Sequence, residues 1–196
     1  MNRFIVAAIC CLLALILPTV TWAISAQWDL DPISGDWNTA ANWTPNGIPN
    51  GPADIATFGL SHTTDVSISA NTEVDSIAFT PAAMNSYLIT VNPDITLTIS
   101  GLGITNNSGL TQTFHVGGGF FARSFGDQIG RMNFTNSASA GNANIELGSG
   151  ASMSFFNRSS AASATLSGGN ESSWNFFDTS TAGSAFMNNA GGLTSL

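Results

Sequence analysis

The last third of the chain repeats itself with a constant step of 21 residues. The recurring positions hold large apolar side chains, alanines and one polar residue, and no insertion interrupts the register. The columns begin near residue 132 and comprise Met132, Met153 and Trp174; Phe134, Phe155 and Phe176; Asn136, Asn157 and Asp178; Ala140, Ala161 and Ala182; Ala143, Ala164 and Ala185; and Ile145, Leu166 and Met187. Six columns that share one step predict a repeated structural unit, which buries its apolar positions against the next copy.

Upstream of the repeats, apolar and polar residues alternate with a period of two, and no sustained helical period occurs after residue 27. The clearest runs are 65–69, 74–79, 88–91 and 95–99, and Asn, Gly, Pro or Asp separates each run from the next. This pattern is typical of short strands with one buried face. It predicts an all-β chain.

A step of 21 residues with strand-like content favours a right-handed parallel β-helix, a solenoid in which equivalent residues of successive coils stack about 4.8 Å apart. The Phe column then becomes an aromatic stack. The column of Asn136, Asn157 and Asp178 becomes a ladder of hydrogen bonds at a corner, since Asn and Asp tolerate left-handed backbone. The alternative fold is a β-sandwich with similar hairpins, although sandwiches space their strands by about 8–12 residues.

The solenoid is expected to be short or truncated, because three steps of 21 residues rise only about 14 Å. The chain stops at Leu196, inside a repeat, which suggests the front part of a longer protein. A solenoid end without a cap exposes strand edges, so self-association through an open edge is also expected.

Residues 1–23 have the layout of a cleaved signal peptide. Arg3 precedes an apolar run at 4–17, and the small residues that end at Ala23 fit a peptidase site, with Ala26 as a second candidate. About 14 apolar residues are fewer than the roughly 20 that a membrane-spanning helix needs, so removal is favoured over an uncleaved anchor. We therefore expect an extracellular or outer-membrane-surface location and no stable membrane span in the mature chain.

Charged side chains are scarce and mostly acidic. The formal net charge is −8, from twelve acidic residues and four basic ones, which are Arg3, Arg123, Arg131 and Arg158; there is no Lys. Removal of the leader takes Arg3 away and leaves a net charge of −9. Nucleic-acid binding needs a basic face that displaces counterions from phosphate, so this class of function is excluded. Both cysteines, Cys10 and Cys11, lie in the leader, so the mature chain forms no disulfide.

These observations divide the chain into four regions. They are a cleaved signal peptide at 1–23, a Trp-rich N-terminal cap region at 24–60, a leading β-strand region at 61–131 and the 21-residue repeats at 132–196. In the cap region, Trp28, Trp37 and Trp43 are expected to cover the open end of the first coil with their flat side chains. The alternative is an exposed platform on which the same rings stack against sugars.

The cap region also carries a family likeness. Residues 35–43 read GDWNTAANW, followed by Ile-Pro at 48–49 and ADIATF at 53–58. This opening resembles that of bacterial autotransporter-type surface proteins with autotransporter-associated β-strand repeats, as do GLGITNNSG at 101–109 and the small-residue turn SAGNA at 139–143. The resemblance implies an exported β-helical passenger. The outer-membrane β-barrel translocator of that family is absent from this sequence.

Catalytic and metal-binding patterns are sparse. The two histidines, His62 and His115, cannot be paired with a particular serine, so we name no catalytic residue. Asp29, Asp31, Ser34 and Asp36 offer oxygen ligands for Ca²⁺ but lack the spacing of the twelve-residue calcium loop. We therefore expect no metal site and no cofactor.

The sequence thus favours an exported, non-enzymatic bacterial surface protein, whose β-helical passenger projects from the cell for contact or adhesion. The expected partner is a surface glycan or matrix ligand. The alternative is a secreted β-helix polysaccharide-active enzyme or carbohydrate-binding module, in which Glu146 and Asp127 are the candidate carboxylates.

Overall fold

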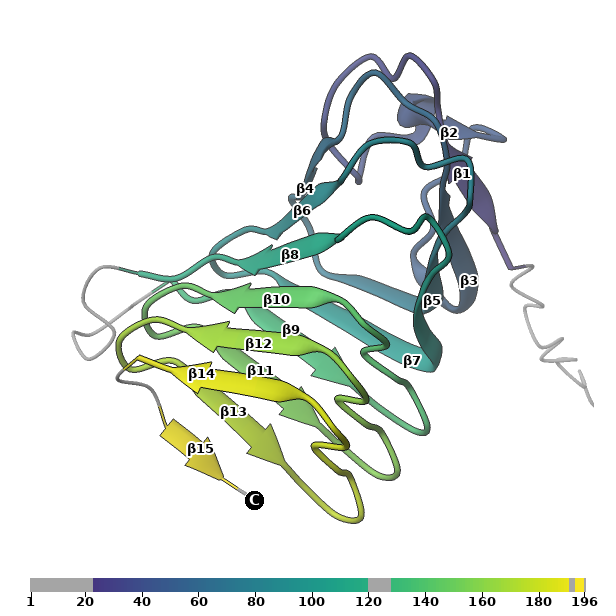
Figure 1. Ribbon diagram of the computed structural model, residues 1–196. Coiled ribbons are helices and arrows are strands. Elements are labelled where there is room, and N and C mark those ends of the chain that lie inside the picture. The colour runs from purple at the N-terminus through teal and green to yellow at the C-terminus, as the bar shows by residue number, and fades with distance from the viewer. Residues whose placement is uncertain (1–22, 120–127, 191–192, 196) are drawn as a thin grey trace, which may run out of the picture.

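Two sheets run along the protein in the computed structural model, which describes residues 23–119, 128–190 and 193–195 (Figure 1). Sheet A has nine strands in the spatial order β15 (Leu193–Ser195), β13 (Ser173–Phe176), β11 (Ser152–Phe155), β9 (Arg131–Phe134), β7 (Thr96–Asn106), β5 (Thr72–Phe79), β3 (Gly51–Phe58), β1 (Ala26–Trp28) and β2 (Trp43–Thr44). Sheet B has six, in the order β14 (Phe186–Asn189), β12 (Thr165–Gly168), β10 (Asn144–Leu147), β8 (Thr113–Val116), β6 (Leu88–Val91) and β4 (Asp65–Ile68). The strands of both sheets are parallel except for β2, which is antiparallel to its neighbour. The predicted all-β parallel solenoid is confirmed, and the β-sandwich alternative is wrong.

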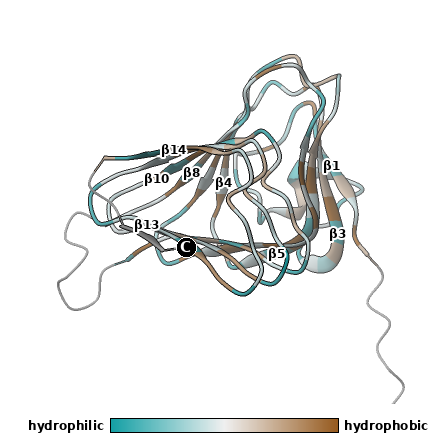
Figure 2. Cartoon of the chain, turned by 60° about the horizontal axis from the view of Figure 1, so that its bottom comes forward, coloured by the Kyte–Doolittle hydropathy of each residue, from teal (hydrophilic) through white to brown (hydrophobic). Residues whose placement is uncertain are grey.

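Most strands bury alternate residues in the space between the two sheets, although β14 has no fully buried residue. In β11, for example, Met153 and Phe155 are buried, whereas Ser152 and Ser154 are partly exposed. Hydrophobic residues therefore lie mainly on the strands, and many of the connecting turns are hydrophilic (Figure 2). Burial of these apolar side chains supplies the main stabilisation, about 25 cal/mol per Å² removed from water.

The columns predicted from the 21-residue step stack in register, and they extend further than the sequence indicated. In sheet B, for example, the apolar column of Ile145 runs back through β8, β6 and β4, and its buried members are Val66, Ile89, Phe114, Ile145 and Leu166. The Phe column forms the expected aromatic stack: ring centroids are 4.8 Å apart between Phe134 and Phe155 and 4.8 Å apart between Phe155 and Phe176.

The polar column forms the predicted ladder at a corner. Asn136, Asn157 and Asp178 have φ angles of 56°, 58° and 58°, in the left-handed region. Between the three members of the column the donors are backbone groups, whereas the side-chain amide of Asn136 donates to the carbonyl of Ser100 in the preceding coil at 2.7 Å. The N–H of Asn136 donates to Oδ1 of Asn157 at 3.0 Å, and the N–H of Asn157 donates to Oδ2 of Asp178 at 2.9 Å. Each side chain thus pairs a backbone group of the preceding coil.

The solenoid continues through the leading region with coils of unequal length. In sheet A, Phe58 of β3 pairs with Phe79 of β5, again a step of 21, but Phe79 pairs with Asn106 of β7, a step of 27. The next step, from Ile99 to Phe134, is 35. The sequence repeat begins near residue 132 because only there does the coil length become constant.

The amino-terminal end of the solenoid is covered. Strand β2 has two residues and lies antiparallel to β1, beside the short 3₁₀-helix η1 (Ala40–Asn42). At the edge of sheet B, the N–H of Ser67 in β4 donates to the carbonyl of Gly35 at 2.8 Å, and the N–H of Trp37 donates to the carbonyl of Ser67 at 2.9 Å. The cap therefore pairs with Ser67 at the edge of sheet B, and β2 pairs with the edge of β1 in sheet A.

Tyr87 joins the first coils inside the core. Its side chain is 2% exposed, and its hydroxyl donates to the carbonyl of Gly59 at 2.7 Å. Its backbone N–H donates to Oε1 of the buried Gln112 at 2.7 Å. Burial raises the pKa of Tyr87 from 10.0 to about 12.

A substitution series at Asn157 tests the corner ladder. We expect Asn157→Ala to lower the free energy of unfolding by about 2–3 kcal/mol, because it removes the acceptor for Asn136 and leaves Ala in left-handed backbone. Asn157→Asp keeps an acceptor, as Asp178 does naturally, and should change stability by less than about 0.5 kcal/mol. Asn157→Gly relieves the backbone but not the lost acceptor, and should lie between them. Urea denaturation measures all three, and equal stabilities of the Ala and Asp variants would contradict the ladder.

The alkaline limb of the stability curve tests the burial of Tyr87, which is the one tyrosine of a chain that has no lysine. Between pH 10 and about 12 we expect stability to fall, because unfolded Tyr87 releases its proton near pH 10 and the buried hydroxyl retains it. Tyr87→Phe cannot ionise, so it should flatten this decline, at a cost of about 1 kcal/mol for the lost hydrogen bond. Thermal unfolding followed by circular dichroism across this range provides the measurement. Parallel curves for the two proteins would refute the prediction.

Candidate functional site

The outer surface of sheet B is a mainly polar face, here called the sheet-B face, with Leu88 and Phe186 as its exposed apolar members. Two outward residues of each strand form it, in register from β4 to β14 (Figure 1). One column is Asp65, Leu88, Thr113, Asn144, Thr165 and Phe186, and the other is Ser67, Thr90, His115, Glu146, Ser167 and Asn188. Most of these side chains are short, and they carry hydroxyl, amide, imidazole or carboxylate groups.

The formal charges on the sheet-B face are those of Asp65 and Glu146, and the face carries no Lys or Arg. The two arginines within the described residues lie elsewhere: Arg131 is in β9 of sheet A, and Arg158 is in the turn after β11. The face is therefore negative on balance, which disfavours anionic ligands.

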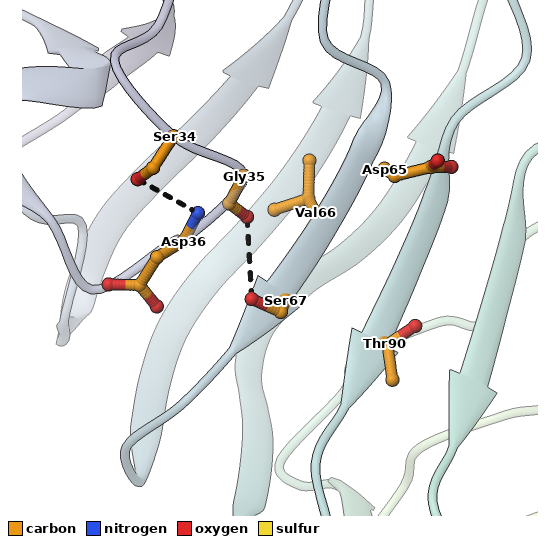
Figure 3. A pocket seen from close by; sticks show the side chains of 7 residues that line it. All are labelled: Ser34, Gly35, Asp36, Asp65, Val66, Ser67 and Thr90. Carbon is orange, nitrogen blue, oxygen red and sulfur yellow. Dashed lines mark hydrogen bonds between the residues drawn. The ribbon is translucent and has the colours of Figure 1, made fainter.

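A hollow of about 340 Å³ lies where the sheet-B face meets the cap (Figure 3). Three elements line it, and their residues are Ser34, Gly35 and Asp36 of the cap, Asp65, Val66 and Ser67 of β4, and Thr90 of β6. The cap wall is held in place by the backbone pairing of Gly35 and Trp37 with Ser67.

Most polar groups of the hollow are already engaged. The Asp36 carboxylate accepts hydrogen bonds from Thr39 Oγ1 at 2.7 Å and Ser69 Oγ at 2.6 Å, and it points away from Asp65 (Figure 3). Ser67 Oγ donates to the carbonyl of Gly35 at 3.5 Å. The exposed Asp65 carboxylate and the Thr90 hydroxyl make no side-chain hydrogen bond within the described ranges, so these two groups are available to a ligand.

Of the two carboxylates that the sequence offered for carbohydrate chemistry, the structure describes one. Glu146 lies on the sheet-B face beside His115, its register partner on β8, and its Oε1 accepts a hydrogen bond from Asn144 Nδ2 at 2.9 Å. Asp127 lies outside the described residues.

The acidic stretch of the cap does not converge. Asp29 Oδ1 accepts a hydrogen bond from the Thr44 hydroxyl, Asp31 Oδ1 lies 2.6 Å from His62 Nδ1, and Asp36 is held as described above. Within residues 23–119, 128–190 and 193–195, no group of three or more His, Cys, Asp or Glu side chains is arranged to hold a metal ion.

The pair of Asp31 and His62 has the geometry of two members of a catalytic triad, but both side chains are largely exposed, 74% and 69% respectively. The neighbouring Ser61 hydroxyl donates to the carbonyls of Leu30 and Thr63 at 3.3 Å and 3.1 Å. It is therefore directed to the backbone rather than to the imidazole.

The cap tryptophans are buried, as expected of side chains that close the first coil, and their burial contradicts an exposed sugar platform. Trp28, Trp37 and Trp43 are each 0% exposed and pack edge-to-face around Trp43, with ring centroids 5.0 Å and 4.9 Å from it. Each indole N–H donates to a backbone carbonyl, at 2.9 Å to Thr63, 3.1 Å to Pro49 and 2.7 Å to Trp37 respectively. The rings thus complete the core of the first coil.

Comparisons with known proteins identify no relative, so only the fold can be used to classify the chain. No protein-family model, no curated protein and no solved structure matches it. Its stacked parallel strands place the protein in the class of β-solenoids. A proposal for its function has to start from its surfaces.

Tryptophan fluorescence tests the buried cap. The four tryptophans that the structure describes, the three above and Trp174 at 1% exposed, should give blue-shifted emission and weak quenching by acrylamide. Addition of soluble oligosaccharides should leave the emission unchanged. A red-shifted spectrum that sugars quench or shift would restore the platform interpretation.

Proposed function

We propose that this protein is an exported, non-enzymatic bacterial surface protein that makes contacts through the side of a β-solenoid. The observation that carries this proposal is the sheet-B face, which extends over six strands of a rigid fold whose amino-terminal end is covered. The leader-like residues 1–23 and the likeness of the opening to autotransporter-type passengers support export to the cell surface.

The chemistry of the face favours a neutral, hydroxyl-rich ligand such as a surface glycan or matrix polymer. From β6 to β12 its backbone groups pair with the neighbouring strands, so away from β14 the face offers no free edge for a peptide strand. Short hydroxyl, amide and carboxylate side chains suit sugar hydroxyls, and each coil adds one more row. Binding is weak at each row and accumulates along the ligand.

Self-association through the far end belongs to the same proposal. Strands β14 and β15 are the outermost strands of their sheets, and Phe186 of β14 is 66% exposed. Unpaired strand edges are ready templates for pairing with another chain. Within the described part of the chain, no helix has the length and apolar character needed to cross a membrane.

The test is to express the full chain in a bacterium with an outer membrane and to locate it. We expect surface labelling on intact cells and binding of the purified protein to cell-surface or matrix glycans. Neutralising the face with Asp65→Asn and Glu146→Gln should weaken glycan binding severalfold. Glu73→Gln removes one negative charge from sheet A and serves as the matched control for each single substitution.

Retention inside the cell would contradict export. Equal glycan binding by the face variants and the Glu73→Gln control would contradict the assignment of the sheet-B face. Turnover of a polysaccharide by the purified protein would overturn the non-enzymatic role.

A further inference from the structure

A buried carboxylate fixes the start of the ordered chain. Asp54 lies in β3 and is only 5% exposed. Its Oδ1 accepts a hydrogen bond from the backbone N–H of Ile24 at 2.6 Å, and its Oδ2 accepts one from the N–H of Asn50 at 2.9 Å. Both donors are neutral amides as long as residue 23 remains attached to Ile24.

This carboxylate has no cationic side chain as a partner. Among the described residues, the one ion pair joins Asp31 and His62. The chain contains no Lys at all, so few positive charges exist that could approach Asp54. A buried carboxylate gains most from a charged donor, because charge-assisted hydrogen bonds are stronger than neutral ones and water screens them less.

The residue that Asp54 holds follows directly after the expected end of the leader. We propose that hydrolysis of the Ala23–Ile24 peptide bond turns the Ile24 nitrogen into an α-ammonium group that forms an ion pair with Asp54, so that removal of the leader stabilises the folded solenoid. This inference rests on the proposed function, because leader removal is part of export.

The chemistry of the step is ordinary peptide hydrolysis by a signal peptidase of the exporting cell. Water adds its oxygen to the carbonyl carbon of Ala23, the C–N bond breaks, and Ala23 leaves as a carboxylate. The freed amine of Ile24 takes up a proton, since α-amino groups have pKa values near 7.7–8.0. No movement of Ile24 is needed, because its nitrogen already lies 2.6 Å from the carboxylate oxygen.

The geometry also separates the two cleavage sites that the sequence allows. Cleavage after Ala26 would remove the contact of Ile24 with Asp54 and the hydrogen bond from the Ile55 N–H to Ser25 Oγ at 3.2 Å. It would also remove Ala26 itself, which is 4% exposed and pairs with Ala56 in β3. Ala23 is exposed, and cleavage after it keeps all of these contacts.

A double-mutant cycle on the chain from residue 24 to 196 tests the ion pair. The amino terminus is either free or acetylated, and acetylation restores the neutral amide that the precursor has at Ile24. Each form is made with Asp54 and with Asp54→Asn, and chemical denaturation gives the folding equilibrium constant. We expect acetylation to lower that constant about tenfold with Asp54 in place, and about twofold or less in the Asp54→Asn protein.

The matched control is Asp94→Asn, which removes a carboxylate from the exposed turn between β6 and β7. In this variant, acetylation of the amino terminus should lower the folding equilibrium constant as much as it does in the unsubstituted chain. Equal stabilities of the free and acetylated chains with Asp54 would overturn the ion pair, and this comparison needs no substitution. The intact mass of the exported protein supplies the second readout: a chain that starts at Ile24 supports the proposal, and one that starts at Gln27 overturns it. The expected acetylation effect in a protein that cells fail to export would contradict the proposed function and uphold the ion pair.

Discussion

Parallel pairing in register is the interaction on which the rest of this structure depends. Because each coil lies directly above its equivalent, one side-chain type repeated along the sequence becomes a continuous column in space. The rings of Phe134, Phe155 and Phe176 stack for this reason, and the side chains of Asn157 and Asp178 reach the backbone of the preceding coil. A chain with 8% charged residues and no Lys obtains its order from these columns rather than from ion pairs.

Columns of this kind need a defined beginning, and the amino-terminal cap provides it. The three buried tryptophans close the first coil, the two-residue strand β2 pairs with β1, and the segment at Gly35–Trp37 covers β4. The opposite end has no comparable cover among the described residues: the backbone of β14 is paired on one side, by β12. Among the described residues, the two ends of the solenoid therefore differ: cap residues pair with the outermost coil at one end, whereas β14 and β15 are the outermost strands at the other.

The sequence predicted those parts of the fold in which the coil length is constant. The columns from Met132 onwards and the left-handed corner at Asn157 follow from the 21-residue step alone. The earlier coils belong to the same sheets but were not recognised as repeats, because the steps from Asp65 to Leu88 and from Leu88 to Thr113 are 23 and 25. The hollow was not predicted either, since no spacing links Asp36 of the cap with Thr90 of β6. The pair of Phe58 and Phe79, which keeps the step of 21, was the one signal that could have extended the repeat.

The few carboxylates fall into two groups: some hold parts of the fold together, and others lie on the surface that the proposed function uses. Asp54 and Asp178 hold backbone N–H groups, and Asp36 accepts hydrogen bonds from Thr39 within the cap and from Ser69, which ties the cap to the first coil. Asp65 and Glu146 hold no backbone group and lie exposed on the sheet-B face, where the fold does not require them. A solenoid has two ends whatever its length, whereas its side grows with every coil. The two carboxylates that the fold leaves unused therefore lie on the side that grows with every coil, which is where the proposed contact with a long ligand would be made.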